Sequence, residues 1–173
     1  GPDLTGSLLF NSLPVSATGA YRIAVADMNG DFLDDIIAVS AGNVQIALQY
    51  QNNQFITSTY PVNIQFLPTW SMAIGDIDGN GFNDIVLGGG QGVSFLYAED
   101  NGFGYRHVAE ETYVFSQRTN MVDLNNDGNL DVFVCHDVAP NVFYINDGTG
   151  GLTYYQGGIG DHPNGGNYGS IWF

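Results

Sequence analysis

The chain has 173 residues, of which 18 are acidic, three are arginines and none is a lysine, which gives a formal net charge of -15. This charge excludes nucleic acid as the expected partner, because phosphate groups need a basic surface. Aliphatic and aromatic residues are plentiful, and no stretch approaches the ~18 consecutive apolar residues of a membrane span. The length and composition therefore predict one globular domain with a hydrophobic core.

Short apolar runs separated by turns of Gly, Asn and Asp follow one another along the chain, and no helical period is evident. Four strands recur every ~45–50 residues, which is typical of β-propeller blades. The expected fold class is all-β, a β-propeller segment of about three four-stranded blades with partial terminal strands. The expected strands are residues 22–28, 35–40, 44–50 and 55–62, then 71–77, 85–89, 93–99 and 105–110, then 119–124, 132–136, 142–146 and 152–156.

Both ends resemble parts of further blades. Residues 8–10 are similar to an outer strand, and residues 168–173 are similar to the stretch that directly precedes Asp76. Because propellers close with about four to eight blades, we expect the chain to belong to a longer ring or to complete one by self-association. The expected division is 1–19 (a proteolytic scar and an outer strand), 20–66, 67–115 and 116–160 (three blades), and 161–173 (the first strand of a further blade).

An acidic loop recurs between the first and second expected strands of each blade. Side-chain oxygens stand at its positions 1, 3, 5 and 9, and position 7 would add a backbone carbonyl. Calcium takes about six to eight oxygen ligands, and ligands on alternating residues converge when a loop curls. The candidate metal ligands are Asp27, Asn29, Asp31, Leu33 and Asp35, then Asp76, Asp78, Asn80, Phe82 and Asp84, then Asp123, Asn125, Asp127, Asn129 and Asp131.

The first loop departs from the other two at position 6, where Phe32 replaces the glycine found at Gly81 and Gly128. Glycine allows the positive φ that a tight curl needs, so the sequence defines the geometry of the first loop least. The alternative interpretation is that Asp, Asn and Gly only form tight turns. The recurrence of the same ligand positions in all three loops favours about three calcium ions, which would bind nine of the 18 acidic residues.

Other calcium motifs fit less well. An EF-hand needs glutamate at position 12 and helices on both sides, whereas position 12 is Ala38, Leu87 or Val134 within apolar runs. A calcium β-roll needs tandem Gly-Gly-x-Gly-x-Asp nonapeptides, which the sequence lacks.

The three Asp-x-[Asp/Asn]-x-[Asp/Asn]-x-x-x-Asp loops between short strands resemble FG-GAP/VCBS repeats, the calcium-loop blades of integrin-α-like propellers. Residues 120–128 and 167–173 are especially similar to secreted repeat proteins of bacteria. The resemblance implies a secreted or cell-surface location and a role in cell adhesion or ligand binding. Some members of the family are lectins, and others are non-catalytic parts of larger secreted proteins.

A catalytic role would have to use His107, His136 or His162, and two of these stand beside a carboxylate, in His136-Asp137 and Asp161-His162. Neighbouring residues in a strand point to opposite faces, so the first pair need not meet. No nucleophile elbow, zinc-protease helix motif or phosphate loop is present. We therefore expect no enzyme and no catalytic residues, and a hydrolase component stays the least favoured alternative.

Aromatic and hydrogen-bonding residues mix near Trp70, Tyr105, Trp172 and residues 161–167. Sugar sites combine an aromatic platform with a polar rim, but the favoured interpretation is that the two tryptophans pack between blades and that the Gly-Asn runs are ordinary turns. The favoured hypothesis is a calcium-binding, non-catalytic extracellular module for binding or adhesion, with calcium structural in the loops and a protein or glycan as ligand. The alternative is a carbohydrate-binding lectin.

Overall fold

The computed structural model describes residues 22–51, 54–66, 68–100, 102–106, 108, 113–160, 162 and 164–172. These residues form twelve strands and no α-helix, so they contain no helix able to cross a membrane. The fold is all-β, as the strand pattern predicted.

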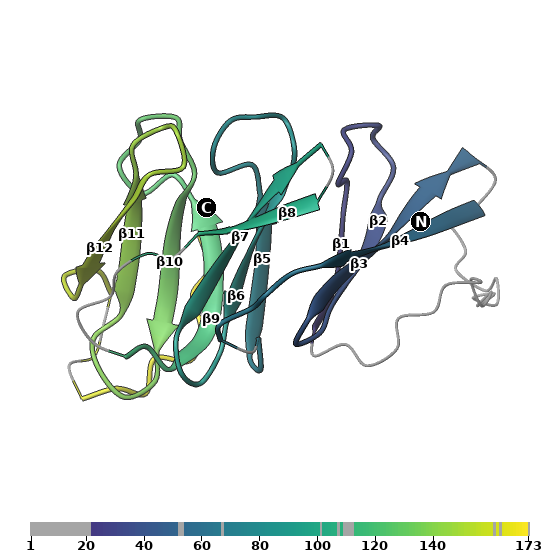
Figure 1. Cartoon of the computed structure of the whole chain (residues 1–173). Helices are drawn as coiled ribbons and strands as arrows, with labels where there is room; N and C mark the ends of the chain where they lie inside the picture. The colour runs from purple at the N-terminus through teal and green to yellow at the C-terminus, as the bar shows by residue number, and fades with distance from the viewer. Residues whose placement is uncertain are drawn as a thin grey trace, which may run out of the picture.

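The strands form three four-stranded antiparallel sheets that follow the order of the chain (Figure 1). Each sheet is a meander in which every strand pairs with the next one, which is the form of a propeller blade. The three sheets form an open arc rather than a closed ring. The first sheet contains β1 (Arg22–Ala26), β2 (Asp35–Val39), β3 (Asn43–Tyr50) and β4 (Gln54–Pro61), the second contains β5 (Ser71–Gly75), β6 (Asp84–Gly88), β7 (Val93–Glu99) and β8 (Gly102–Arg106), and the third contains β9 (Ser116–Val122), β10 (Asp131–His136), β11 (Val142–Asn146) and β12 (Leu152–Gln156).

The second sheet lies between the other two and buries both of its faces. Successive strand residues point to opposite faces, so Ile85 and Leu87 of β6 pack toward the first sheet with Ile37. Val86 packs in the core shared with the third sheet, where the rings of Phe95 and Tyr144 meet edge to face with centroids 5.0 Å apart. The alternating apolar side chains of β6 thus contribute to two separate hydrophobic cores.

Most strand positions agree with those expected from the sequence, and β7, β11 and β12 have the expected bounds. The largest difference is β8, which begins at Gly102 instead of residue 105. Glu99 pairs directly with Gly102, so β7 and β8 are joined by a tight hairpin that needs fewer loop residues than we expected. Within the expected strand 105–110, residues 107, 109 and 110 lie outside the described residues.

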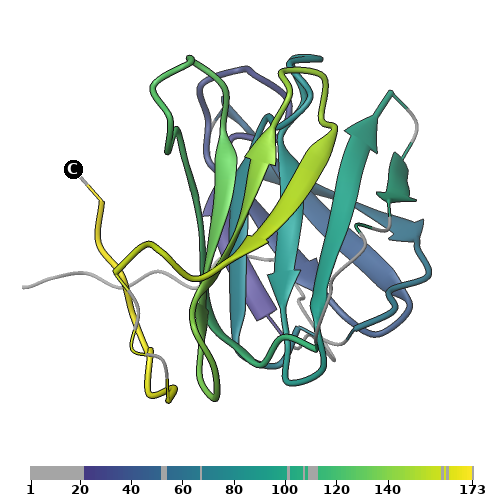
Figure 2. The same ribbon diagram turned by 90° about the vertical axis from the view of Figure 1, so that its left-hand side faces the viewer.

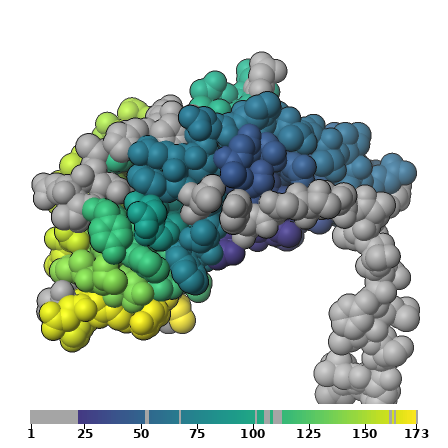
Figure 3. Space-filling model, turned by 60° about the horizontal axis from the view of Figure 1, so that its bottom comes forward, coloured from purple at the N-terminus to yellow at the C-terminus, as the bar shows by residue number. Residues whose placement is uncertain are grey.

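The C-terminal segment differs from the first strand of a further blade that was expected within 161–173. Its described part, residues 164–172, forms no strand and lies along the third sheet (Figures 2 and 3). The Trp172 ring packs edge to face on Phe133, with centroids 5.0 Å apart, and Asn120 donates a hydrogen bond to the Ser170 hydroxyl at 2.6 Å. Side-chain contacts and a backbone hydrogen bond from Gly166 to the Asp137 carbonyl oxygen, and not strand pairing, hold this segment. The strand expected at 8–10 lies outside the described residues, and the division into blades stays a prediction.

Candidate metal centre

The three acidic loops connect the first and second strands of each sheet and lie at the same edge of the arc, at the top of Figure 1. Position 1 of each loop directly follows the inner strand, and position 9 is the first residue of the next strand. Strand pairing brings these ends together, because Ala26 pairs with Asp35 and Gly75 pairs with Asp84. The antiparallel register therefore closes each loop before any ligand is considered.

The carboxylate at position 1 organises the curl of each loop. In the second loop the Asp76 carboxylate accepts hydrogen bonds from the backbone N–H groups of Asn80 at 3.1 Å and Gly81 at 2.9 Å. Asp27 and Asp123 accept the corresponding bonds from positions 5 and 6 of their own loops. The same contacts therefore form in all three loops, including the first.

Positions 3 and 5 continue the network with the same spacing. The side-chain oxygen at position 3 accepts from the backbone N–H of position 5, and the oxygen at position 5 accepts from the N–H of position 7. Side-chain bonds two residues along the backbone are typical of Asx turns. The residues at positions 3 and 5 are Asn29 and Asp31, Asp78 and Asn80, and Asn125 and Asp127.

Two left-handed residues produce the curl. Position 4 has φ of 76° at Gly30, 70° at Gly79 and 59° at Asn126. Position 6 has φ of 90° at Gly81 and Gly128, and Phe32 takes the same region with φ of 67°. The first loop thus adopts the shape of the others despite its phenylalanine, with the backbone strain of a bulky left-handed residue.

The aspartate at position 9 is fully buried in each loop and connects the loop to the third strand of its sheet. Asp84 accepts from the N–H of Ile77, at position 2 of the loop, at 2.8 Å and from the N–H of Ala98 in β7 at 2.7 Å. Asp35 and Asp131 make the equivalent pairs of bonds. A carboxylate oxygen that accepts one hydrogen bond retains a second lone pair, so these groups can still ligate a cation.

Three carboxylates converge in the second loop. Asp76, Asp78 and Asp84 each offer an oxygen within 4.8 Å of the other two, and the described residues contain no other such group of three acidic, histidine or cysteine side chains. Two oxygens that bind one calcium ion at ~2.4 Å can lie at most about twice that distance apart, so this donor set fits calcium. The Asn80 amide does not enter the cluster with its nitrogen, because Nδ2 donates to the Ala98 carbonyl at 2.9 Å.

The first and third loops distribute their charges differently, with asparagine at position 3 and aspartate at position 5. The Asn29 amide donates to the Asp31 carboxylate at 3.1 Å, and the Asn125 amide donates to Asp127 at 2.8 Å. The asparagine oxygens accept backbone N–H groups within their own loops. Among the described residues, three carboxylates converge in the second loop and not in these two.

Burial and hydrogen bonding act in opposite directions on the loop carboxylates. Desolvation, with smaller contributions from the charges of Asp78 and Asp76, raises the pKa of Asp84 to about 6 against the hydrogen bonds from Ala98 and Ile77. Desolvation likewise raises the pKa of Asp35. A bound divalent cation would reverse this effect, since it stabilises the ionised form.

His136 and Asp137 do not form the acid–base pair considered from the sequence. His136 is buried, its Nε2 lies 3.1 Å from the Tyr113 carbonyl oxygen, and its Nδ1 accepts from the Val138 N–H at 3.4 Å. The Asp137 carboxylate accepts from the Gln117 amide at 3.0 Å. Both ring nitrogens of His136 thus have backbone partners, which is a structural arrangement. His107 and Asp161 lie outside the described residues.

Two asparagines that the motif does not include connect neighbouring blades at the loop edge. Asn83 donates to the carbonyl oxygen of Asp27 in the preceding blade at 2.6 Å. Asn146 donates to the carbonyl oxygen of Ile77 at 2.7 Å. Sequence reasoning missed both: position 8 is Asp34, Asn83 or Leu130 and shows no common pattern, and Asn146 lies outside the loops at the end of β11.

Residues 27–87 match the family model described as the FG-GAP-like repeat. This stretch is an FG-GAP-like repeat. The matched range runs from the first residue of the first loop through the second loop to β6, so it joins two neighbouring sheets. The third loop lies beyond the FG-GAP-like match and repeats its hydrogen bonds. A search of curated proteins finds no match to the chain.

Proposed function

We propose that this chain is a calcium-binding, non-catalytic extracellular module for ligand binding or adhesion, in which calcium is structural. The observation that carries the proposal is the convergence of the Asp76, Asp78 and Asp84 oxygens within 4.8 Å. The position 9 carboxylate in this cluster also bonds to β7. A cation at the loop would therefore stabilise the connection between the first three strands of a blade.

The repetition of the loop supports more than one ion. All three loops hold positions 1, 3, 5 and 9 with the same backbone bonds, and calcium accepts neutral asparagine oxygens beside carboxylates. Like-charged groups held this close repel one another without a counter-ion. We propose about three ions, with the second loop as the strongest site because three carboxylates converge there.

The family match supports the remaining parts of the proposal. The match to the FG-GAP-like repeat supports the proposal that this chain lies outside the cell and is not an enzyme. The large acidic excess is compatible with this setting, since bound calcium would offset part of the charge.

Titration calorimetry of the full chain with calcium, together with thermal unfolding in calcium and in chelator, tests the proposal. Binding to the native state alone adds about 2.7 kcal/mol per site at a hundredfold excess over Kd, so calcium should raise the melting temperature clearly. Asp76→Asn should weaken one site and leave the others, while magnesium at equal concentration controls for ionic strength. Equal melting temperatures and no heat of binding would overturn the proposal.

A further inference from the structure

Two cavities lie on the inner strands β1, β5 and β9 and share Arg118, which lines both. The first cavity has a volume of about 340 Å³ and is lined at the inner strands by Arg22, Trp70 and Thr119 among others. The second has a volume of about 420 Å³ and lies between β9 and the C-terminal segment. Together we call them the inner groove. Each volume falls in the range of ~300–1,000 Å³ that is usual for ligand pockets.

The described lining of the inner groove differs in charge from the whole chain. Among the residues that the structure describes, no acidic side chain lines either cavity, although the chain has 18 acidic and only three basic side chains. Two of the three arginines, Arg22 from β1 and Arg118 from β9, line the groove. A recess with one sign of charge concentrates ligands of the opposite sign, and arginine suits carboxylate groups in particular.

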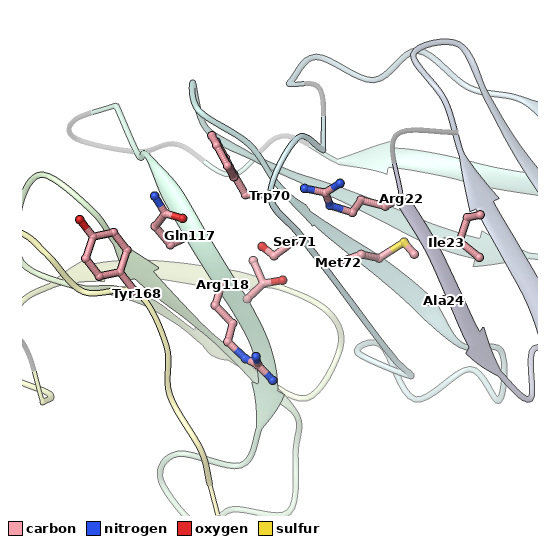
Figure 4. Close-up of a pocket in the computed structure, with 10 residues that line it drawn as sticks. Arg22, Ile23, Ala24, Trp70, Ser71, Met72, Gln117, Arg118 and Tyr168 are labelled. Carbon is pink, nitrogen blue, oxygen red and sulfur yellow. The ribbon is translucent and has the colours of Figure 1, made fainter. Parts of the chain in front are cut away.

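Figure 4 shows how these side chains lie. Arg22 reaches from β1 toward Trp70, which directly precedes β5, whereas the guanidinium of Arg118 points toward the other end of β9. The two charges come from the first and third sheets. They therefore suit two separate anionic groups along one extended ligand better than a single small anion.

An aromatic surface lies beside the charges. The Trp70 side chain is 48% exposed, and its ring rests against Phe115 with centroids 5.9 Å apart. Tyr168, which is 66% exposed, lines the same cavity from the C-terminal segment. A supported and exposed indole is a platform for the apolar face of a sugar ring.

The groove also contains a hydroxyl that lacks a partner. Thr119 lines the first cavity with a side chain that is 5% exposed, and its Oγ1 has no hydrogen-bond partner. An unsatisfied buried polar atom costs free energy, so such atoms often mark a ligand position. The neighbouring Ser71 hydroxyl is engaged with Ser116 at 3.2 Å.

We propose that the inner groove binds an acidic oligosaccharide, with carboxylates at Arg22 and Arg118 and a sugar ring on Trp70. This inference rests on the proposed binding function and names the ligand class and the site. A peptide of acidic residues would satisfy the arginines as well, but its side chains offer no flat apolar face to the exposed indole. The groove therefore favours a glycan.

The test is titration calorimetry of the full chain in calcium with a β-1,4-linked glucuronate trisaccharide. Neutral cellotriose has the same linkage without the carboxylates, and tri-glutamate has the carboxylates without sugar rings. We expect the glucuronate trisaccharide to bind at least tenfold more tightly than either. Arg22→Gln, Arg118→Gln and Trp70→Ala should each weaken it at least tenfold. Arg106→Gln is the matched control, because Arg106 lies on β8, the outermost strand of the second sheet. The affinity of this variant for the trisaccharide should stay within twofold of that of the unchanged chain.

Tighter binding of tri-glutamate, equal binding of cellotriose, or unchanged affinity in both arginine variants would overturn the inference. Arg22 and Arg118 lie in different sheets, so each variant checks the other if one fails to fold. A chelator titration separates this inference from the calcium proposal. Arginine-dependent binding of the trisaccharide without any heat of calcium binding would contradict the calcium proposal alone. Calcium binding without trisaccharide binding would contradict only the proposal that the inner groove binds a glycan.

Discussion

The amide nitrogen of Asn83 lies 2.6 Å from the carbonyl oxygen of Asp27, and this hydrogen bond joins the second acidic loop to the first residue of the loop before it. The two residues lie in the loops of different sheets, so neighbouring blades are connected at this edge as well as through the core below it.

Replacing this amide should weaken the contact between the first two blades. Asn83→Ala removes a part-buried hydrogen bond, and we expect the free energy of unfolding to fall by about 1 kcal/mol. Urea denaturation measures the change, with the exposed Asn164→Ala as control. A loss equal to that of the control would show that the core alone holds the blades together.

The buried aspartate at position 9 should matter more than the asparagine at position 5. Asp84→Ala leaves the N–H groups of Ile77 and Ala98 without partners, at about 1–3 kcal/mol for each buried group. Asn80→Ala loses neutral bonds to Ala98 and Phe82, and we expect a loss of about 1 kcal/mol. Urea denaturation in chelator isolates this effect from metal binding, and calcium titrations of both variants should give the same order. A smaller loss for Asp84→Ala would show that its two bonds are not stabilising.

Phe32→Gly should stabilise the chain. Phe32 has φ of 67° and its side chain is 95% exposed, so the substitution removes backbone strain and almost no packing. Relief of ~1–2 kcal/mol of left-handed strain is partly offset by the greater freedom of glycine in the unfolded chain, and we expect a net gain of about 0.5–1 kcal/mol. Thermal unfolding measures it.

Gly81→Ala is the matched reverse change, because Gly81 occupies the same position with φ of 90° and open space around its Cα. It should destabilise the chain by about 1 kcal/mol. The same sign for both substitutions would mean that φ at position 6 does not govern stability.

The calcium-free chain should become more stable on mild acidification. The pKa of Asp84 is raised from 3.8 to about 6 by desolvation, so the folded state binds more protons than the unfolded state between those two values. Stability therefore falls as the pH rises through this window, and the raised pKa of Asp35 acts in the same direction. Unfolding in chelator between about pH 4.5 and 7 measures the slope, which should decrease in Asp84→Asn. An equal slope in the variant would assign the effect to other groups.

The sequence predicts some features of the fold and of the loops more completely than others. Strand alternation and the turn residues identify the three sheets, and β7 was predicted with its bounds because apolar residues fill it and turns flank it. The positions of the loop oxygens were also readable, since their spacing fixes which side chains curl inward. Whether they bind calcium, and whether copies of the chain associate, stay predictions for titration and light scattering.

Features that depend on contacts between blades could not be predicted from the sequence. Nothing in the sequence pairs Asn83 with Asp27, because the contact joins positions from different repeats. The inner groove could not be predicted either, since Arg22 and Arg118 line one cavity only when β1 and β9 lie on the same side of the arc. Their rarity in so acidic a chain was the one available signal.

The middle sheet is covered on both faces, so its stability depends on two neighbours, whereas each outer sheet in the described chain shares a core with one. Such an array behaves as a row of coupled units in which unfolding starts most easily at the ends. Amide hydrogens of β6 should then exchange with solvent last, and only when an outer sheet has already opened. The chain therefore has a built-in order of opening in which the acidic loop of Asp76, at the edge of the middle sheet, is preserved longest.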